Sequence, residues 1–380
     1  MTPPEPPTPG SKPGHKVPIT IVCAGGGGVG KTTSSAALAV ALARTGARTL
    51  VVTVDPARRL AHAMGVEITE EVQPAHVEPA VEGKLFALMP EPRRSTPTFA
   101  KVLFEDRPED LARVMQNPVY LTMADAAAGM HEIVSLILVA KAIEDAEYDY
   151  LVIDTAPSRN ALDFVSYPGR LAVLFEGRAV GWLGSLAKNV AENEKGPGLF
   201  ASMEKRVEAL FGRILNPRVL KDLAQLFADL ALIKDRFARF ARMSERMLLG
   251  ERTRYLLVAA PTGSAQADVS FIAKRLGRLN HTPTALLLNR SDVEEPAWLG
   301  QLRKEAPGWP PLADAVTQVE HEFQVRKRAG DRLAAALAKD VSRAPQVRMP
   351  TLEAPDPAAI VRELATRMEP HLETLVRSKK

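Results

Sequence analysis

The chain contains a single cysteine among its 380 residues. One thiol excludes an intramolecular disulfide and any structural zinc site built from the cysteines of one chain. Aromatic residues make up only 5% of the sequence and do not alternate with a tight cluster of lysine and arginine, so nucleic-acid binding gains no support. No apolar run is long enough to span a bilayer. Together these features favour a protein of the reducing cytoplasm.

The rest of the composition is that of an ordinary globular protein, with 46% hydrophobic residues, 25% charged residues and a net charge of +4. Residues 1–16 are rich in proline and lack an apolar core. We expect them to form a disordered tail and not a signal peptide.

The most informative feature is a glycine-rich segment between an expected strand, Val17–Cys23, and an expected helix, Ser34–Arg44. It fits the phosphate-loop pattern G-x-x-x-x-G-K-[ST]. Glycine lets the backbone wrap closely around a phosphate, and the free N–H groups at the helix start favour negative charge. The pattern predicts a nucleotide site formed by Gly25, Gly26, Gly27, Gly28, Val29, Gly30, Lys31, Thr32 and Thr33.

Four side chains have expected roles in hydrolysis. Lys31 should reach the β- and γ-phosphates, and Thr32 should bind Mg²⁺ through its hydroxyl. Asp55 follows the second expected strand, where it could orient or deprotonate the attacking water, or could instead cap the next helix. Asp154 ends an apolar strand like a Walker B aspartate and would position Mg²⁺ through water, with a simple cap as the alternative.

Apolar runs alternate with helical patterns along the chain, which predicts an α/β fold with a mostly parallel sheet flanked by helices. We expect one P-loop ATPase domain over residues 17–380, with an inserted helical subdomain from about 96–145 and 168–250. The expected strands are 17–23, 49–54, 85–89, 150–154, 255–260, 285–288 and 347–349.

The second helical interval carries an amphipathic stripe of apolar side chains at helical spacing. The stripe either packs on its own helical neighbours or lines an apolar surface for a partner. Its members are Leu223, Leu226, Leu230, Ile233, Phe237, Phe240 and Met247.

The segments GGVGKTT, DPARRL and DTAPSRNALDF, with a later strand ending in Asn289, resemble the ArsA-type anion-transporting ATPases. These are relatives of the ATPase that guides tail-anchored membrane proteins, within the wider MinD/ParA group. The resemblance implies that Asp55 activates water, that Asp154 belongs to the metal site and that Asn289 contacts adenine. It also implies a nucleotide-gated homodimer with ATP and Mg²⁺ as cofactors, whose tail-anchored branch carries clients on helical subdomains.

Three features depart from that family. Its signature lysine, which contacts phosphate across the dimer, would fall at Gly26, and our hypothesis is that Arg58, Arg59 or Arg159 supplies the missing charge. Arsenite binding requires several soft thiolates, but only Cys23 is present. For the same reason the Cys-x-x-Cys zinc site of the tail-anchored branch is absent.

Two further segments have alternative interpretations. Residues 289–292, Asn-Arg-Ser-Asp, superficially echo the guanine-reading motif N-K-x-D, whereas the resemblance favours adenine and a loop position for Asp292. Residues 357–378 form a helical pattern followed by a basic end. That helix either docks on the sheet or contacts a membrane, and its apolar face comprises Ile360, Leu364, Met368, Leu372 and Leu375.

The sequence therefore predicts Mg²⁺-dependent ATP hydrolysis that drives a dimer switch, in protein targeting or in the handling of an apolar client segment. One alternative is a MinD/ParA-like regulatory or positioning ATPase that acts through a membrane or a protein partner. Another is a weak ATPase used as a nucleotide-dependent binding module.

Overall fold

The computed structural model describes residues 17–53, 59–67, 69, 71–91, 95–126, 130–155, 217–292, 297–306, 309–352, 354 and 356–376. The chain divides into two compact units. The first, called here the sheet unit, comprises residues 1–89, 143–163 and 247–380. The second, the helical unit, comprises residues 90–142 and 164–246.

The sheet unit is built on an eight-stranded sheet in the order β3-β4-β2-β5-β1-β6-β7-β8. Every neighbouring pair is parallel except β3 and β4. The result confirms the predicted α/β fold with a mostly parallel sheet. The strands are β1 Ile19–Ala24, β2 Thr49–Thr53, β3 Gln73–Pro74, β4 Leu85–Leu88, β5 Tyr150–Asp154, β6 Thr253–Ala259, β7 Ala285–Asp292 and β8 Gln346–Pro350.

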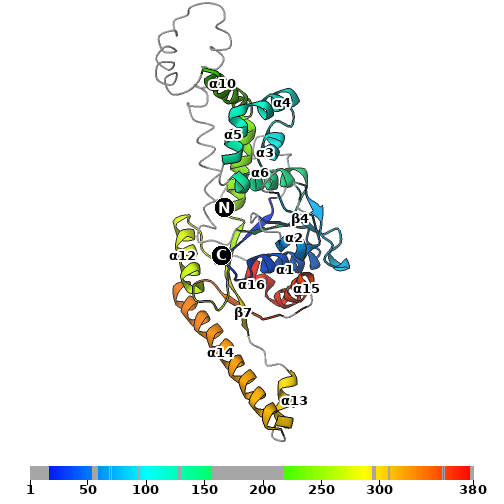
Figure 1. Cartoon of the computed structure of the whole chain (residues 1–380), viewed down its shortest axis with the longest axis vertical. Coiled ribbons are helices and arrows are strands. Elements are labelled where there is room, and N and C mark those ends of the chain that lie inside the picture. The colour runs from blue at the N-terminus through cyan, green and yellow to red at the C-terminus, as the bar shows by residue number, and fades with distance from the viewer. Residues whose placement is uncertain are drawn as a thin grey trace, which may run out of the picture. The chain divides into compact units, whose positions relative to one another are not determined.

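Helices cover the sheet because its central strands are apolar on both faces. Helix α1 consists largely of alanine and small residues, so it packs closely on both the sheet and α15 (Figure 1). Helix α12 packs on β6, and α14 packs on β7. The helices are α1 Lys31–Arg44, α2 Arg59–Met64, α12 Ala265–Arg278, α13 Ala297–Glu305, α14 Pro310–Asp340, α15 Pro357–Met368 and α16 Leu372–Val376, with short 3-10 turns at Pro79–Val81 and Glu369–His371.

The C-terminal region is not the single helix that its periodicity predicts. Helix α15 ends at Met368, and a 3-10 turn containing Pro370 separates it from α16. Leu364, Met368 and Leu375 belong to the main apolar core. The apolar face of this segment is therefore docked within the sheet unit, as in the first of its two interpretations.

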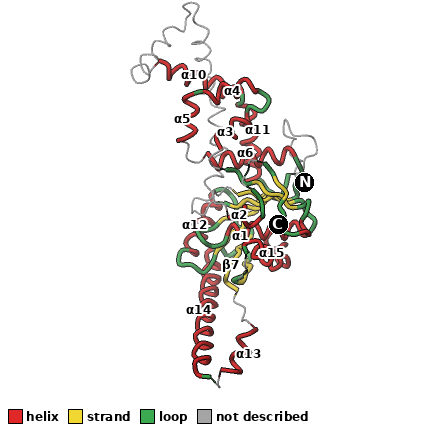
Figure 2. The backbone as a smooth tube through the Cα atoms, turned by 45° about the vertical axis from the view of Figure 1, so that its right-hand side comes forward, coloured by secondary structure: helices red, strands yellow, loops and turns green. Residues whose placement is uncertain are grey.

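The described part of the helical unit contains helices and turns but no strand, as Figure 2 shows by colour. Phe99 and Phe237 meet edge to face at 6.0 Å between ring centroids. From the predicted stripe, Leu226, Ile233, Phe237 and Phe240 of this unit are buried, and so is Met247, which belongs to the sheet unit. These members therefore pack on other parts of the chain. The helices are α3 Ser95–Leu103, α4 Pro108–Gln116, α5 Pro118–Ala126, α6 Met130–Asp145, α10 Pro217–Leu232 and α11 Lys234–Leu249.

A buried carboxylate joins two helices of this unit. Asp229 of α10, which is 1% exposed, accepts hydrogen bonds from Arg113 of α4 at 2.5 and 2.9 Å. The Asn117 amide donates to the Asp222 carbonyl at 2.7 Å. Residues 168–216 of the predicted helical subdomain lie outside the described residues. Among the helices that are described, none combines the length and the apolar character needed to cross a bilayer.

Candidate nucleotide site

The phosphate loop joins the end of β1 to the first residue of α1, as its sequence pattern predicts. Gly28 and Gly30 have φ angles of 70° and 87°, which glycine adopts without steric penalty. Gly25 is required for a different reason: a Cβ atom there would lie 2.2 Å from the Val258 carbonyl oxygen of β6. The glycines therefore fit both the turn of the loop and its close packing on the sheet.

The N-terminus of α1 is suited to an anion. Its N-cap, Gly30, provides no side-chain cap, and the first turn contains no acidic residue. The first N–H groups of a helix lack intrahelical partners, and the helix dipole favours negative charge beside them. Lys31, Thr32 and Thr33 form this first turn. This is the geometry with which a helix start binds phosphate.

Lys31 contacts the phosphate loop, which the sequence pattern also predicted to bind nucleotide. Its ammonium donates to the Gly26 carbonyl at 3.0 Å, and the residue is 5% exposed. A cation held in this position, beside free backbone N–H groups, can neutralise charge on a phosphate chain.

Asp154 occupies the end of β5, beside the first turn of α1. Its carboxylate is fully buried and accepts hydrogen bonds from Ser35 at 3.3 Å and Thr53 at 3.4 Å. Ser35 follows Thr32 by three residues, so the two hydroxyls lie on neighbouring positions of one helix face. The position of Thr32 is therefore one helical turn before the Ser35 hydroxyl that contacts Asp154.

This donor set fits Mg²⁺, which prefers oxygen ligands and keeps several of its waters. A hydroxyl and one carboxylate, completed by phosphate oxygens and water, are its usual partners at such sites. Across the described residues no cluster of three or more His, Cys, Asp or Glu side chains offers a full protein cage. The arrangement is thus compatible with a metal held jointly by the chain and a nucleotide.

Cys23 is a core residue. It is fully buried at the end of β1 and opposite Asp154 in the parallel register. Burial raises the pKa of its thiol to about 12, although a hydrogen bond with Ser35 acts in the opposite direction. A thiol that stays protonated is a poor ligand for soft metals, which bind the thiolate.

The end of β7 is attached to the phosphate loop by two consecutive residues. The Asn289 amide donates to the Val29 carbonyl at 3.0 Å, and the Arg290 guanidinium donates to the Gly28 carbonyl at 2.5 Å. A Cβ atom on Gly30 would lie 2.2 Å from the same Asn289 nitrogen. The predicted base-contacting residue is therefore in direct contact with the predicted phosphate-binding loop.

The structure brings together the loop, Lys31, Thr32, Asp154 and Asn289 at the carboxyl edge of the sheet. Asp55, Arg58 and Arg159 lie outside the described residues, as does the side chain of Arg59. The sequence analysis missed the supporting hydroxyls of Ser35 and Thr53, the loop contact of Arg290 and the position of Asp268 beside Gly26. Only Arg290 had a sequence signal, through its place in the Asn-Arg-Ser-Asp segment.

A buried parallel strand, a glycine loop, a lysine at the helix start and an aspartate ending a neighbouring strand define the class of P-loop nucleotide-binding proteins. The profile of the anion-transporting ATPases matches residues 19–256, which is more than half of the chain. The chain therefore belongs to the anion-transporting ATPase family.

Several relatives share part of this sequence. ATPase get3 of Schizosaccharomyces pombe is 27% identical over 199 residues, which cover 52% of this chain and 56% of the relative. ATPase GET3 of Malassezia globosa is 34% identical over 151 residues, covering 40% of this chain and 43% of the relative. ATPase get3 of Aspergillus terreus is 30% identical over 150 residues, covering 39% and 42%. The chain matches about half of the length of these curated relatives.

Proposed function

We propose that the chain is a Mg²⁺-dependent ATPase. The observation that carries the proposal is that Lys31, the start of α1 without a side-chain cap, and Asp154 lie together beside the phosphate loop. Membership of an ATPase family supports the same activity. The reaction is attack of water on the γ-phosphorus, with cleavage of the bond to the β,γ-bridging oxygen and release of ADP and phosphate.

Each group has a separate task in this proposal. Lys31 and the N–H groups of the loop stabilise the negative charge that spreads over the transferring phosphoryl group. Thr32 and Asp154 would hold Mg²⁺, which would supply positive charge to neutralise the phosphate chain. Asp55, by its resemblance to the family's switch I residue, orients the attacking water and accepts its proton.

The orientation of Asn289 favours adenine. Because the Val29 carbonyl can only accept, the side-chain nitrogen of Asn289 must face it. The amide oxygen of Asn289 then remains to accept a hydrogen bond from the base. The 6-amino group of adenine can donate such a bond, whereas the 6-oxo group of guanine cannot. We therefore propose ATP, and not GTP, as the preferred substrate.

Phosphate release by the purified full chain tests the proposal. Wild-type protein with ATP and Mg²⁺ should turn over, and Lys31→Met, Asp55→Asn and Asp154→Asn should each reduce kcat by at least about tenfold, since each removes transition-state stabilisation. Inosine triphosphate, which carries a 6-oxo group, should show a higher KM than ATP. Nucleotide binding without turnover would favour the binding-module alternative, and wild-type activity in all three variants would refute the assigned site.

We further propose that the ATPase acts in the cytoplasm as a nucleotide-gated homodimer that handles an apolar client. Support comes from the family and from the exposed apolar side chains of Leu121, Val219 and Leu232 in the helical unit. Light scattering measures the molar mass of the chain with ADP and with a non-hydrolysable ATP analogue. Nucleotide gating predicts a dimer with the analogue and a monomer with ADP. Capture under ATP should enrich apolar membrane-protein segments. Capture of a single partner without such a segment, or of vesicles, would instead favour the regulatory alternative.

A further inference from the structure

Arg290 follows the predicted base-contacting residue and has an unusual backbone. Its φ angle is 54°, in the left-handed region. Among the described residues, only Asn280 shares a positive φ without being glycine, and asparagine tolerates that region far better than arginine does. For a non-glycine residue this conformation is sterically disfavoured. A residue held in this conformation must be fixed by its surroundings.

The surroundings of Arg290 supply that constraint. The pairing of β7 with β8 shifts register between Leu288 and Asp292, so the strand bulges at this point. The Ser291 hydroxyl donates to the Leu288 carbonyl at 2.6 Å, which closes the bulge on itself. Gly330 of α14 lies so close that a Cβ atom there would be 2.6 Å from the Ser291 carbonyl oxygen. The bulge is thus supported by α14, and Arg290 within the bulge reaches the phosphate loop.

The contact with the loop has a specific geometric effect. A trans peptide unit is planar, and its carbonyl and N–H group point in opposite directions. The Gly28 carbonyl shares its peptide unit with the Val29 N–H, and the Val29 carbonyl shares its unit with the Gly30 N–H. By holding these two carbonyls toward β7, Arg290 and Asn289 turn both N–H groups away from β7. Backbone N–H groups oriented together in a turn are what phosphate-binding loops present to their ligand.

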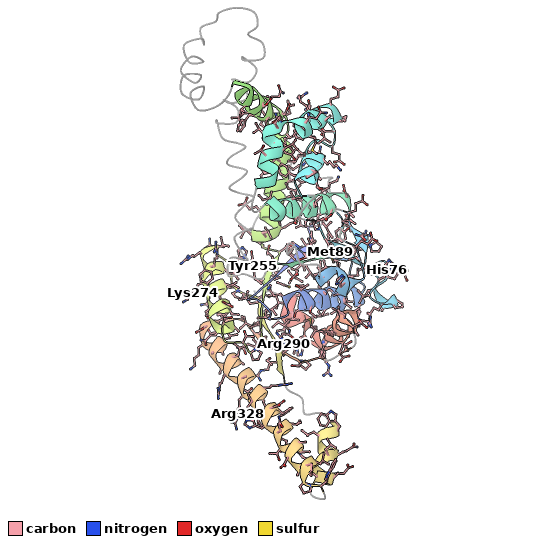
Figure 3. The ribbon with its side chains drawn as sticks, viewed as in Figure 1. His76, Met89, Tyr255, Lys274, Arg290 and Arg328 are labelled. Atoms are coloured by element: carbon pink, nitrogen blue, oxygen red, sulfur yellow. The ribbon has the colours of Figure 1, made fainter. Side chains whose placement is uncertain are left out.

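We propose that Arg290 is a positioning residue that presets the Val29 N–H of the phosphate loop for the β-phosphate and couples it to the base-contacting Asn289. Figure 3 labels Arg290 in the sheet unit. The inference rests on the proposed nucleotide site but not on hydrolysis, since it concerns the binding of the diphosphate. Without the guanidinium, the Gly28–Val29 peptide loses this restraint on its carbonyl. Glycine at position 28 tolerates a wide range of backbone angles and does not replace the restraint. The site must then order this peptide when nucleotide binds.

The test compares Arg290→Gly with wild type in calorimetric titrations of the full chain with ADP and with adenosine, both in the presence of Mg²⁺. Glycine suits the left-handed backbone but has no donor, so the folded state should be at least as stable as wild type while the loop contact is lost. We expect ADP affinity to fall several-fold, toward tenfold, because the lost bond comes from a charged donor at an exposed site. Adenosine affinity should change less than twofold, because adenosine has no phosphate.

Two further variants separate positioning from a general charge effect. Arg290→Lys keeps a charge and one donor, and it should recover part of the ADP affinity. Arg328→Met, which removes an exposed arginine of α14, should leave both affinities unchanged. In steady-state kinetics, Arg290→Gly should raise KM for ATP more than it lowers kcat, since the preset N–H group serves ground state and transition state alike.

The outcomes are distinct. ADP affinity within twofold of wild type in Arg290→Gly would overturn the positioning role. Equal losses for ADP and adenosine would also overturn it, because the contact would then serve the base and not the phosphate. Absence of any nucleotide binding by wild type would refute both this inference and the proposed function. If the wild-type chain binds ADP but does not turn over ATP, only the proposed hydrolysis is refuted. The ADP affinities of wild type and Arg290→Gly then still test the positioning role.

Discussion

The side chain of Asp268 occupies the space beside Gly26. A Cβ atom built on Gly26 would lie 2.5 Å from the Asp268 Oδ2 and 3.3 Å from its carboxyl carbon. Asp268 stands in the first turn of α12 and is 7% exposed. The position at which the family carries its signature lysine therefore faces a nearly buried carboxylate in this chain. A side chain at position 26 would therefore require the Asp268 carboxylate to move.

This contact predicts a non-additive effect of two substitutions. Gly26→Ala should destabilise the chain by about 1–2 kcal/mol, because the new methyl group overpacks against Asp268. In an Asp268→Ala background the same change should cost less than about half as much, because the opposing carboxylate is gone. Urea unfolding of the four proteins in a double-mutant cycle measures the coupling. Gly27→Ala is the matched control, since nothing lies within 4 Å of a Cβ at that position. Additive effects in the cycle would show that the two residues do not compete for space.

Cys23 offers a direct probe of the core beside the site. Because burial raises the pKa of its thiol to about 12, very little thiolate is present at pH 8. The thiolate is the reactive form, and a free thiol ionises near pH 8.5. We expect alkylation by iodoacetamide at pH 8 to be slower in the native chain than in urea by a factor on the order of 1,000. Mass spectrometry of the single cysteine measures both rates. Rapid labelling of the native protein would mean that β1 opens readily or that the thiol is not in the core.

Much of the sheet could be predicted from the sequence because buried parallel strands are continuous apolar runs. The expected strand at 150–154 matches β5, and the expected strand at 49–54 matches β2 over residues 49–53, with residue 54 outside the described residues. Strand β3, Gln73–Pro74, was missed because two residues are too few to show the alternation of apolar and polar side chains that is typical of a strand. The C-terminal helix was extended too far because apolar spacing continues past Met368. The signal against this was Pro370, since the residue before a proline disfavours helical geometry.

The candidate site also has a part that the sequence predicts and a part that it does not. The positions of Lys31 and Asp154 could be predicted from local sequence patterns. The glycine loop between a strand and a helix indicates Lys31, and the end of an apolar strand indicates Asp154. The contacts that hold them are long-range. Ser35 and Asp154 are separated by 119 positions, and Arg290 and Gly28 by 262. No periodicity or motif encodes such pairs, because they depend on the sheet order that places the ends of β5 and β7 near the phosphate loop and α1.

Arg44, at the end of α1, links three segments of the sheet unit. Its guanidinium donates to Glu78 at 2.6 and 2.9 Å and to Glu369 at 2.7 Å. The Glu78 side chain is 15% exposed, so water screens the first pair only in part. The hydrogen bond from Arg44 lowers the pKa of the Glu78 carboxyl, while partial burial acts in the opposite direction. These contacts join α1 to the segment before β4 and to the turn after α15.

The lowered pKa of Glu78 gives this link a pH dependence with a definite sign. A carboxyl whose pKa is lower in the folded state stabilises that state fully above its unfolded pKa, near 4.3, and loses this contribution as pH falls through the folded pKa. Glu78→Gln should therefore lower the free energy of unfolding at pH 7 by about 1–3 kcal/mol, and the difference from wild type should shrink as pH decreases below about 4. Urea unfolding at pH 7, 5, 4 and 3 measures it. Glu82→Gln, an exposed neighbour on the same segment, should match wild type throughout. A difference for Glu78→Gln that stays constant down to pH 3 would show that packing of the side chain, and not its charge, stabilises this corner of the fold.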